Sequence, residues 1–147
     1  MIMTIEKDEF TISTDREKLD LHFIHDFLSG ESYWLPGVPF ERVQKAADHS
    51  LNFGLYDQDK QIGYARIVTD YTRIAYLADV FITDAYRGRG LSKWLIQVIM
   101  DHPDLQHLGR WMLNTRDAHG LYEQFGWTKP IRPETYLEIY HPDSYKQ

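Results

Sequence analysis

The stretch Val80–Leu95 reads VFITDAYRGRGLSKWL, and it decides the fold. The apolar, β-branched run at its start predicts the end of a strand, and a short polar turn follows it. Beyond the turn, apolar residues recur at the spacing of one helix face: Leu91, Trp94, Leu95, Val98 and Ile99. This spacing predicts an amphipathic helix directly after the turn.

The turn itself, RGRGLS, has the composition of a phosphate-binding site. A glycine-rich turn between a strand and a helix exposes backbone N–H groups at the helix N-terminus, where anions bind. Gly88 and Gly90 lack a Cβ, so the chain can bend and an anion can approach closely. Arg87 and Arg89 add positive charge. The alternative is an ordinary strand-to-helix turn that uses glycine for its geometry only.

Two common nucleotide motifs fit this turn less well. A P-loop closes with Lys followed by Ser or Thr, whereas Leu91 and Ser92 follow Gly90 here. A dinucleotide fingerprint sits near the start of a βαβ unit, whereas the residues before this turn have an antiparallel pattern. A nucleotide-binding protein is therefore a third hypothesis.

The turn and a second motif together resemble the GNAT family of N-acetyltransferases. The family turn is R-G-x-G, a hydrophobic residue, then Gly or Ala, and a helix follows it. The second motif, A-x-x-L-Y-E-x-F/L-G-F/W, matches AHGLYEQFGW from Ala118 to Trp127. The resemblance covers about residues 50 to 127 well, and the rest only in its coarse pattern. Ser92 stands where the family has Gly or Ala, and Asp84 replaces the usual Pro.

The resemblance implies that the chain binds acetyl-CoA as a co-substrate. In the family, the backbone amides of the turn hold the pyrophosphate, which here assigns cofactor binding to Arg87, Gly88, Arg89, Gly90, Leu91 and Ser92. The pantetheine arm pairs with a splayed strand end, here Val80, Phe81 and Ile82. The Ile82 N–H is the expected donor to the thioester carbonyl. Many relatives contact the cofactor through an Asn where this chain has Thr115, preceded by Asn114, and the sequence leaves both unassigned.

Tyr122 is the candidate general acid, because the second motif places a Tyr at this position. A phenol has an ordinary pKa near 10, so it stays protonated at neutral pH and can donate to a departing thiolate. The alternative is a core role, since Tyr122 shares one helical face with Ala118, Leu121 and Phe125.

The base and the acceptor pocket rest on weaker signals. Asp79 lies in the apolar run YLADVFI and must find partners there, so it is a candidate to orient the amine or accept its proton. A satisfied buried Asp is the equal alternative. Glu31, Tyr33 and Trp34 in the loop ESYWLPGVP, together with Phe53, are the candidates for acceptor binding, with plain core packing as the alternative for the aromatics.

Composition limits the remaining possibilities. A chain of 147 residues that is 43% hydrophobic suits one domain spanning residues 1–147. There are no cysteines, and the net charge of −6 argues against a nucleic-acid partner. His22 and His25 are three residues apart, but no spacing suggests a third metal ligand, so no metal is expected. No signal peptide or membrane-spanning run is apparent, so we expect a cytoplasmic protein without a membrane partner.

The pattern along the chain predicts an α/β fold with a mixed, mostly antiparallel sheet flanked by helices, in the order βααβββαβαβ. Strands are predicted at residues 10–13, 51–55, 61–69, 74–82, 110–114 and 136–140. Helices are predicted from the acidic start at residues 14–17 to Gly30, and at residues 40–50, 91–101 and 118–125. This order matches the GNAT fold.

The leading hypothesis is an acetyl-CoA-dependent N-acetyltransferase. It would transfer acetyl to a primary amine of a small molecule or a protein, by direct attack in a ternary complex. The alternative is a catalytically silent CoA-binding regulatory module. Members of the family are often dimers, so the resemblance also implies a homodimer.

Overall fold

The computed structural model describes residues 1–146, and in this range six strands form one sheet in the order β1-β2-β3-β4-β5-β6. The strands are β1 (Thr4–Lys7), β2 (Phe10–Ser13), β3 (Leu51–Asp57), β4 (Lys60–Thr69), β5 (Ile74–Ile82) and β6 (Arg110–Met112). The helices are α1 (Leu21–Gly30), α2 (Phe40–Asp48), α3 (Leu91–Met100) and α4 (His119–Glu123). Strands β1 to β5 pair antiparallel, and β6 pairs parallel to β5. The predicted mixed, mostly antiparallel α/β fold is confirmed.

The chain divides into two compact units, Met1–Asn114 and Thr115–Gln147. The first unit contains the whole sheet with α1, α2 and α3, and the second contains α4 and the C-terminal segment.

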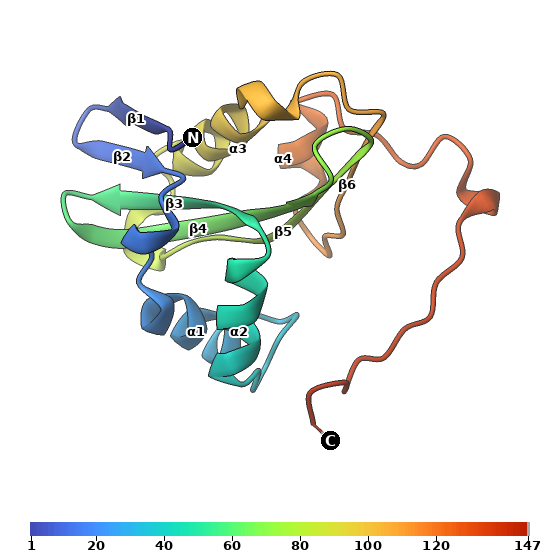
Figure 1. The fold of residues 1–147 in the computed structure, drawn as a ribbon, viewed down its shortest axis with the longest axis horizontal. Helices are drawn as coiled ribbons and strands as arrows, with labels where there is room; N and C mark the ends of the chain where they lie inside the picture. The colour runs from blue at the N-terminus through green and yellow to red at the C-terminus, as the bar shows by residue number, and fades with distance from the viewer. Residues whose placement is uncertain (147) are drawn as a thin grey trace. The chain divides into compact units, whose positions relative to one another are not determined.

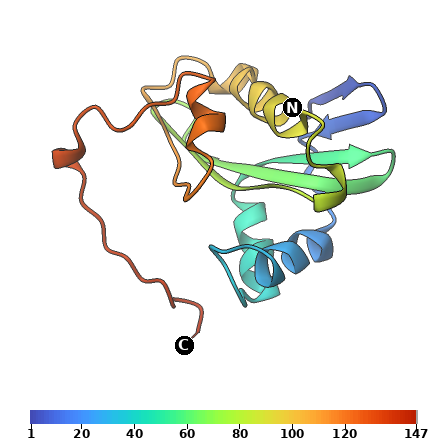
Figure 2. The same ribbon diagram turned by 180° about the vertical axis from the view of Figure 1, so that it is seen from behind.

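Within the first unit, α1 and α2 lie on one face of the sheet and α3 lies on the other (Figures 1 and 2). Phe81 of β5 is stacked on Phe27 of α1, with ring centroids 3.8 Å apart, on the face that α1 and α2 cover. Phe53 of β3 points to the opposite face, where its ring meets His102 at the end of α3. Strand pairing places Tyr64 on the Phe81 face and Ala65 on the Phe53 face.

Buried polar side chains fasten the helices to the sheet. The Asn52 Nδ2 donates to the Ala47 carbonyl at 2.8 Å, and the Tyr64 hydroxyl donates to the Asn52 Oδ1. The Gln61 Oε1 accepts from the Asp20 N–H at 2.8 Å. Each of these buried polar groups has a hydrogen-bond partner within the protein. Because hydrogen bonds are directional, they fix the positions of the helices on the sheet more closely than apolar packing alone would.

The predicted elements and the observed ones differ at both ends of the chain. Strand β1 was not predicted, because its side chains are mostly polar and exposed and its alternation is weak. The acidic start at residues 14–17 caps a short 3-10 helix, Arg16–Lys18, and Asp20 caps α1 instead. The strand predicted at residues 136–140 is wrong: the structure has no strand there, although the composition favours one.

His102 has a buried ring that is expected to make stability depend on pH. It is 1% exposed, its Nδ1 accepts from the Asp104 N–H at 3.0 Å, and its Nε2 has no hydrogen-bond partner among the described residues. Burial lowers the pKa of His102 below its ordinary value of 6.5. As the pH falls, the imidazole of His102 is therefore protonated in the unfolded chain before it is protonated in the folded protein. The free energy of unfolding should decrease as the pH drops below about 6.5.

We expect His102→Asn to reduce this loss, because the amide oxygen can replace Nδ1 as acceptor and does not titrate. The measurement is the free energy of unfolding by urea at pH 7 and pH 5, with the exposed His49→Asn as control. An unchanged pH dependence in His102→Asn would assign the loss to other groups.

Candidate active site

Strand β5 has an unpaired outer edge over most of its length. Its pairing with β6 ends at Tyr76 opposite Met112, so no strand of the described chain pairs with this edge from Leu77 to Ile82. Six extended residues span about 20 Å. An exposed strand edge offers a row of N–H and C=O groups to a ligand that can pair with it.

The alternation of the backbone decides which groups face this edge. The Thr83 N–H donates to the Ile62 carbonyl of β4 at 2.9 Å, so the next N–H groups pointing the other way belong to Ile82 and Val80. Of the three predicted pairing residues, Val80 and Ile82 therefore present their backbone N–H to the open edge. Phe81 does not, because its backbone faces β4 and its side chain is buried against α1.

Asp79 sits at a β-bulge in the middle of this strand. Pairing moves from Tyr64–Phe81 to Arg66–Ala78, so β5 carries one residue more than β4 between these pairs. The φ angle of Asp79 is 56°, in the left-handed region that Asp tolerates better than most residues. Such backbone departures cluster at functional sites, where the surrounding structure holds them in place.

The Asp79 carboxylate is held by two side chains that are distant in sequence. Its Oδ2 accepts from the Arg66 Nε at 2.7 Å, and its Oδ1 accepts from the Trp34 Nε1 at 2.9 Å. The side chain of Asp79 is 6% exposed and that of Arg66 is 19% exposed. The Asp79 carboxylate thus has a donor for each oxygen and ties the loop after α1 to the bulge. Its role toward the amine stays a prediction.

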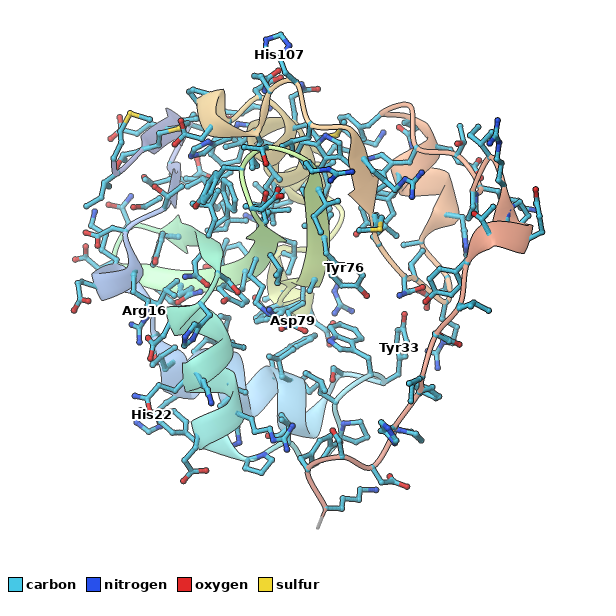
Figure 3. The ribbon with its side chains drawn as sticks, turned by 45° about the vertical axis from the view of Figure 1, so that its right-hand side comes forward. Arg16, His22, Tyr33, Tyr76, Asp79 and His107 are labelled. Carbon is cyan, nitrogen blue, oxygen red and sulfur yellow. The ribbon has the colours of Figure 1, made fainter. Side chains whose placement is uncertain are left out.

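The loop after α1 supplies an aromatic surface on the same side of the sheet. Tyr33 is half-exposed, and its ring meets that of Trp34 edge-on at 4.9 Å. Figure 3 shows Tyr33, Tyr76 and Asp79 on the side of the sheet that faces α1, with His22 far from them. Tyr76 accepts a hydrogen bond at its hydroxyl from the Asn114 Nδ2 at 2.9 Å.

The other two predicted acceptor residues differ in exposure. Phe53 is fully buried on the α3 face, so it is a core residue and not part of this surface. Glu31 is exposed directly after α1, and its backbone N–H closes the helix on the Phe27 carbonyl. The histidines considered as ligands have packing roles: His22 stacks on Phe40, and the His25 Nε2 lies 2.8 Å from the Val38 carbonyl oxygen.

The glycine turn leads from β5 into α3 with the geometry that an anion site requires. Gly88 and Gly90 have φ angles of 80° and 76°, which residues with a Cβ adopt at a cost. The first bond of α3 runs from the Trp94 N–H to the Gly90 carbonyl, so the preceding N–H groups have no helical partner. No side chain of residues 1–146 caps this helix.

The two arginines of the turn have different surroundings. Arg87 donates from Nε to the Ile82 carbonyl at 3.0 Å and pairs with Asp84, so it fastens the turn to the end of β5. Arg89 lies over the ring of Tyr86, 5.2 Å from its centroid. The Tyr86 hydroxyl in turn donates to the Asp57 Oδ2 at 2.6 Å, which raises the pKa of Tyr86.

The second sequence motif forms the short helix α4 in the other unit. The Thr115 Oγ1 accepts from the Ala118 N–H at 3.1 Å, so Thr115 has a structural role at the helix start. Tyr122 is 7% exposed, and its ring meets Trp127 edge-on at 5.8 Å.

Neither the position of Tyr76 nor the partner of Arg66 could be predicted from the sequence. An arginine inside the apolar run YARIV was a signal that a buried acidic partner exists, but its distance of 13 residues from Asp79 does not reveal the pairing. Tyr76 carries no motif, and only the strand register places it on the Arg66 face.

An open hollow of about 430 Å³ lies at the other end of β5, lined by Thr72, Arg73, Ile74, His107, Gly109 and Arg110. Ile74 begins the strand and Ile82 ends it, so this hollow is remote from the glycine turn.

Comparison with known proteins agrees with this geometry. Residues 5–127 match the model of the acetyltransferase (GNAT) family. A crystal structure of a candidate GNAT acetyltransferase from Xanthomonas campestris pv. campestris is 44% identical, with a TM-score of 0.92 over 97% of this chain and 100% of that one. A candidate acetyltransferase of Gibberella zeae is 28% identical over 79% of this chain and 77% of its own length.

A structure from Clostridium acetobutylicum, described as a predicted acetyltransferase with acetyl-CoA, shares the fold at 12% identity. Its TM-score is 0.67, over 95% of this chain and 96% of its own. No helix among the described residues is long and apolar enough to cross a membrane. The extent of the family match and the 44% identity to a solved member lead to one conclusion: the chain belongs to the acetyltransferase (GNAT) family.

Proposed function

We propose that this protein is an acetyl-CoA-dependent N-acetyltransferase that acts on a primary amine of a small molecule or a protein. The observation that carries the proposal is the open edge of β5, which runs from the bulge at Asp79 directly into the glycine turn. A strand edge that leads to a helix N-terminus suits an elongated ligand with amide groups in the middle and phosphates at one end.

The residues of the turn fit the pyrophosphate of CoA. The first turn of α3 provides backbone N–H donors that have no partner in the helix. The space beside Gly88 and Gly90 is open to an anion, since a Cβ at either glycine would meet no protein atom within 4 Å. Arg89 adds charge beside these donors, while Arg87 keeps the turn in register with β5.

The Ile82 N–H is our candidate for stabilising the thioester carbonyl oxygen. It faces the open edge, and the next peptide along the chain is fixed on both sides, because the Ile82 carbonyl accepts from Arg87 and the Thr83 N–H donates to the Ile62 carbonyl. A fixed N–H stabilises the charge that develops on the oxygen as the amine attacks.

The amine would approach from the face that carries Tyr33, Trp34 and Tyr76. Half-exposed aromatic rings suit an acceptor with a flat or apolar part. Asp79 serves as a positioning residue here, because its two hydrogen bonds join the aromatic loop to the strand that holds the reacting thioester. Glu31 is the exposed carboxylate of this loop and our candidate to attract a cationic acceptor.

We propose Tyr122 as the general acid that protonates the departing thiolate, on the basis of its motif. The new amide bond forms as the C–S bond breaks, and the proton of the amine leaves to water. The family match covers residues 5–127, which includes the motif that carries Tyr122.

The test is a thermal melt with acetyl-CoA, CoA and ATP. A ligand at 100 times its Kd adds about 2.7 kcal/mol, or about 5–10 °C for a chain of this size. We expect acetyl-CoA and CoA to raise the Tm and ATP to have less effect. No rise with millimolar acetyl-CoA would remove the proposal, and binding without activity on a panel of amines would favour the silent CoA-binding module.

Gly90→Ala is the matched variant for the phosphate turn. We expect its free energy of unfolding to be about 1–2 kcal/mol lower, because Ala is strained at positive φ. Its methyl group also lies where the anion would approach, so the Kd for CoA should rise at least about tenfold, or ~1.4 kcal/mol. Gly30→Ala is the control, since its Cβ meets nothing within 4 Å and its φ is not positive. Equal CoA affinity in both variants would contradict the assignment.

A further inference from the structure

The hollow at the start of β5 brings together two arginines from different parts of the chain. Arg73 directly precedes β5, and Arg110 begins β6. The Arg73 carbonyl accepts from the Arg110 N–H at 3.0 Å, so the two backbones are in contact. Both residues are exposed, and neither guanidinium has a hydrogen bond or an ion pair with any of residues 1–146.

No carboxylate of the described residues neutralises this hollow. None of the residues that line it is acidic. Asp70, the one carboxylate of the turn between β4 and β5, is directed to the backbone instead. Its Oδ1 accepts from the N–H groups of Thr72, Arg73 and Ile74 at 3.1, 2.8 and 3.1 Å, and these bonds lower the pKa of Asp70 well below its ordinary value. Asp70 therefore shapes the turn and forms no ion pair with Arg73.

Two neighbouring arginines without an acidic partner stand out in this acidic chain. The sequence has 22 Asp and Glu residues against 16 Lys and Arg, for a net charge of −6. Arg16, Arg66 and Arg87 each pair with a carboxylate. Two like charges that line one hollow repel each other, and an anion bound between them removes this repulsion. The hollow is therefore suited to an anionic ligand.

The charge and size of the hollow favour a phosphate monoester. A guanidinium is a planar fork that binds phosphate oxygens through two parallel N–H bonds. A phosphate monoester carries about −1.5 to −2 charges at pH 7 and three acceptor oxygens, which match two such forks. Figure 3 shows the ring of His107 projecting away from the surface, so the arginines supply the charge. The volume of about 430 Å³ is within the roughly 300–1,000 Å³ of small-molecule sites, which leaves room for the organic part of an ester.

The backbone around the two arginines is already ordered by hydrogen bonds. The Thr69 Oγ1 donates to the Ile74 carbonyl at 2.6 Å and accepts from the Tyr71 N–H at 2.9 Å. The Gly109 N–H, like that of its neighbour in the sequence, donates to the Arg73 carbonyl at 3.0 Å. The turn and the start of β6 are thus joined before any ligand arrives, and an ordered site loses less conformational entropy when it binds.

We propose that this hollow is a binding site for a small organic phosphate, whose phosphate group lies between the guanidinium groups of Arg73 and Arg110. The site is separate from the glycine turn, because Ile74 and Ile82 lie at opposite ends of β5 and eight residue steps span about 26 Å. The proposal goes beyond acetyl transfer and does not depend on the proposed function.

The test is an NMR titration of the backbone amides with inorganic phosphate and with glycerol 3-phosphate, against sodium chloride at equal ionic strength. We expect the signals of Arg73, Ile74, Gly109 and Arg110 to shift and to saturate with both phosphates, and not with chloride. The same spectra report on residues 88–91, so phosphate that binds at the glycine turn is recognised separately. A second titration in the presence of CoA should give the same shifts at the hollow.

Variants of the two arginines test their roles. Arg73→Gln and Arg110→Gln should each raise the Kd for glycerol 3-phosphate at least about tenfold, because hydrogen bonds to a charged group are lost. Arg110→Lys keeps the charge but not the planar fork, so it should recover only part of the affinity. Arg132→Gln is the matched control: it removes an exposed arginine of the other compact unit, and we expect an unchanged Kd.

Every other result overturns the proposal. Shifts that grow linearly with phosphate, or an equal loss of affinity in Arg132→Gln, would show general attraction between charges. Shifts confined to residues 88–91 would place the phosphate at the glycine turn alone. Saturable binding of inorganic phosphate without binding of glycerol 3-phosphate would exclude an organic phosphate. The amide spectrum of each variant also verifies that it is folded.

Discussion

Tyr122→Phe is expected to lower the turnover number by about 10²–10⁴ while the affinity for acetyl-CoA changes little. The change removes one oxygen and its proton, and leaves the ring in place against Trp127. A thiolate that departs without a proton donor has to be released as the anion, which raises the barrier of the step in which the C–S bond breaks. The loss should therefore fall on kcat and leave the cofactor Kd as it is.

Tyr56→Phe is the matched control for this variant. Tyr56 is 5% exposed, close to the 7% of Tyr122, and its hydroxyl is buried without a hydrogen-bond partner among the described residues. Removing that hydroxyl should leave turnover unchanged. Steady-state kinetics on both variants, with unfolding curves to verify the fold, measure the difference. Equal turnover in Tyr122→Phe and the unchanged enzyme would show that Tyr122 is a core residue.

Arg66→Met is expected to reduce the free energy of unfolding by about 3–5 kcal/mol. The substitution leaves the Asp79 carboxylate with a single donor, Trp34, at a position where the side chain is 6% exposed. A buried charge without its partner lowers the free energy of unfolding strongly. The intact pair contributes less to stability than its Coulomb attraction suggests, because both charges lose their hydration. For this reason the double variant Arg66→Met with Asp79→Asn should be more stable than Arg66→Met alone.

Arg16→Met provides the comparison at an exposed ion pair. Arg16 lies 2.7 Å from Asp48, the same distance as in the buried pair, but the two side chains are 32% and 50% exposed. Solvent screening should limit the loss there to about 1 kcal/mol or less. Urea unfolding at constant salt measures both variants. A loss below about 1 kcal/mol in Arg66→Met would mean that the pair at the bulge is no stronger than one on the surface.

Arg66→Met should also weaken the binding of the acceptor amine more than the binding of acetyl-CoA. Arg66 and Trp34 share Asp79, so the aromatic loop loses part of its attachment to β5 when Arg66 is removed. We expect the KM for the amine to rise and the Kd for acetyl-CoA to stay close to its original value.

The parts of this protein that could be predicted from sequence are those set by local patterns. Strand β5 was predicted with its observed bounds, Ile74–Ile82, because the run is apolar and rich in β-branched and aromatic residues, with Asp79 as its one charged residue. The glycine turn was predicted because glycine adopts positive φ angles more readily than any residue with a Cβ, and the helix after it because its apolar spacing is regular.

The remaining features depend on contacts between distant residues. Phe53 and Phe81 are both aromatic strand residues, and only the register of the sheet places one under α3 and the other under α1. Asp79 meets Arg66 across 13 residues and Trp34 across 45, and no local pattern contains that information. The segment at residues 136–140 was predicted as a strand from composition, but the structure has no strand there, because composition does not supply the neighbouring strand that the pairing needs.

The bulge at Asp79 also has a consequence for how this chain tolerates changes in length. Successive side chains of a strand alternate between faces, and Ala78 and Phe81 share one face here only because an extra residue lies between them. A deletion of one residue at the bulge would therefore restore a regular ladder, with Phe81 still opposite Tyr64, and would leave no carboxylate facing Arg66 and Trp34. A strand shortened in this way would keep its core packing and lose the ion pair that joins it to the aromatic loop.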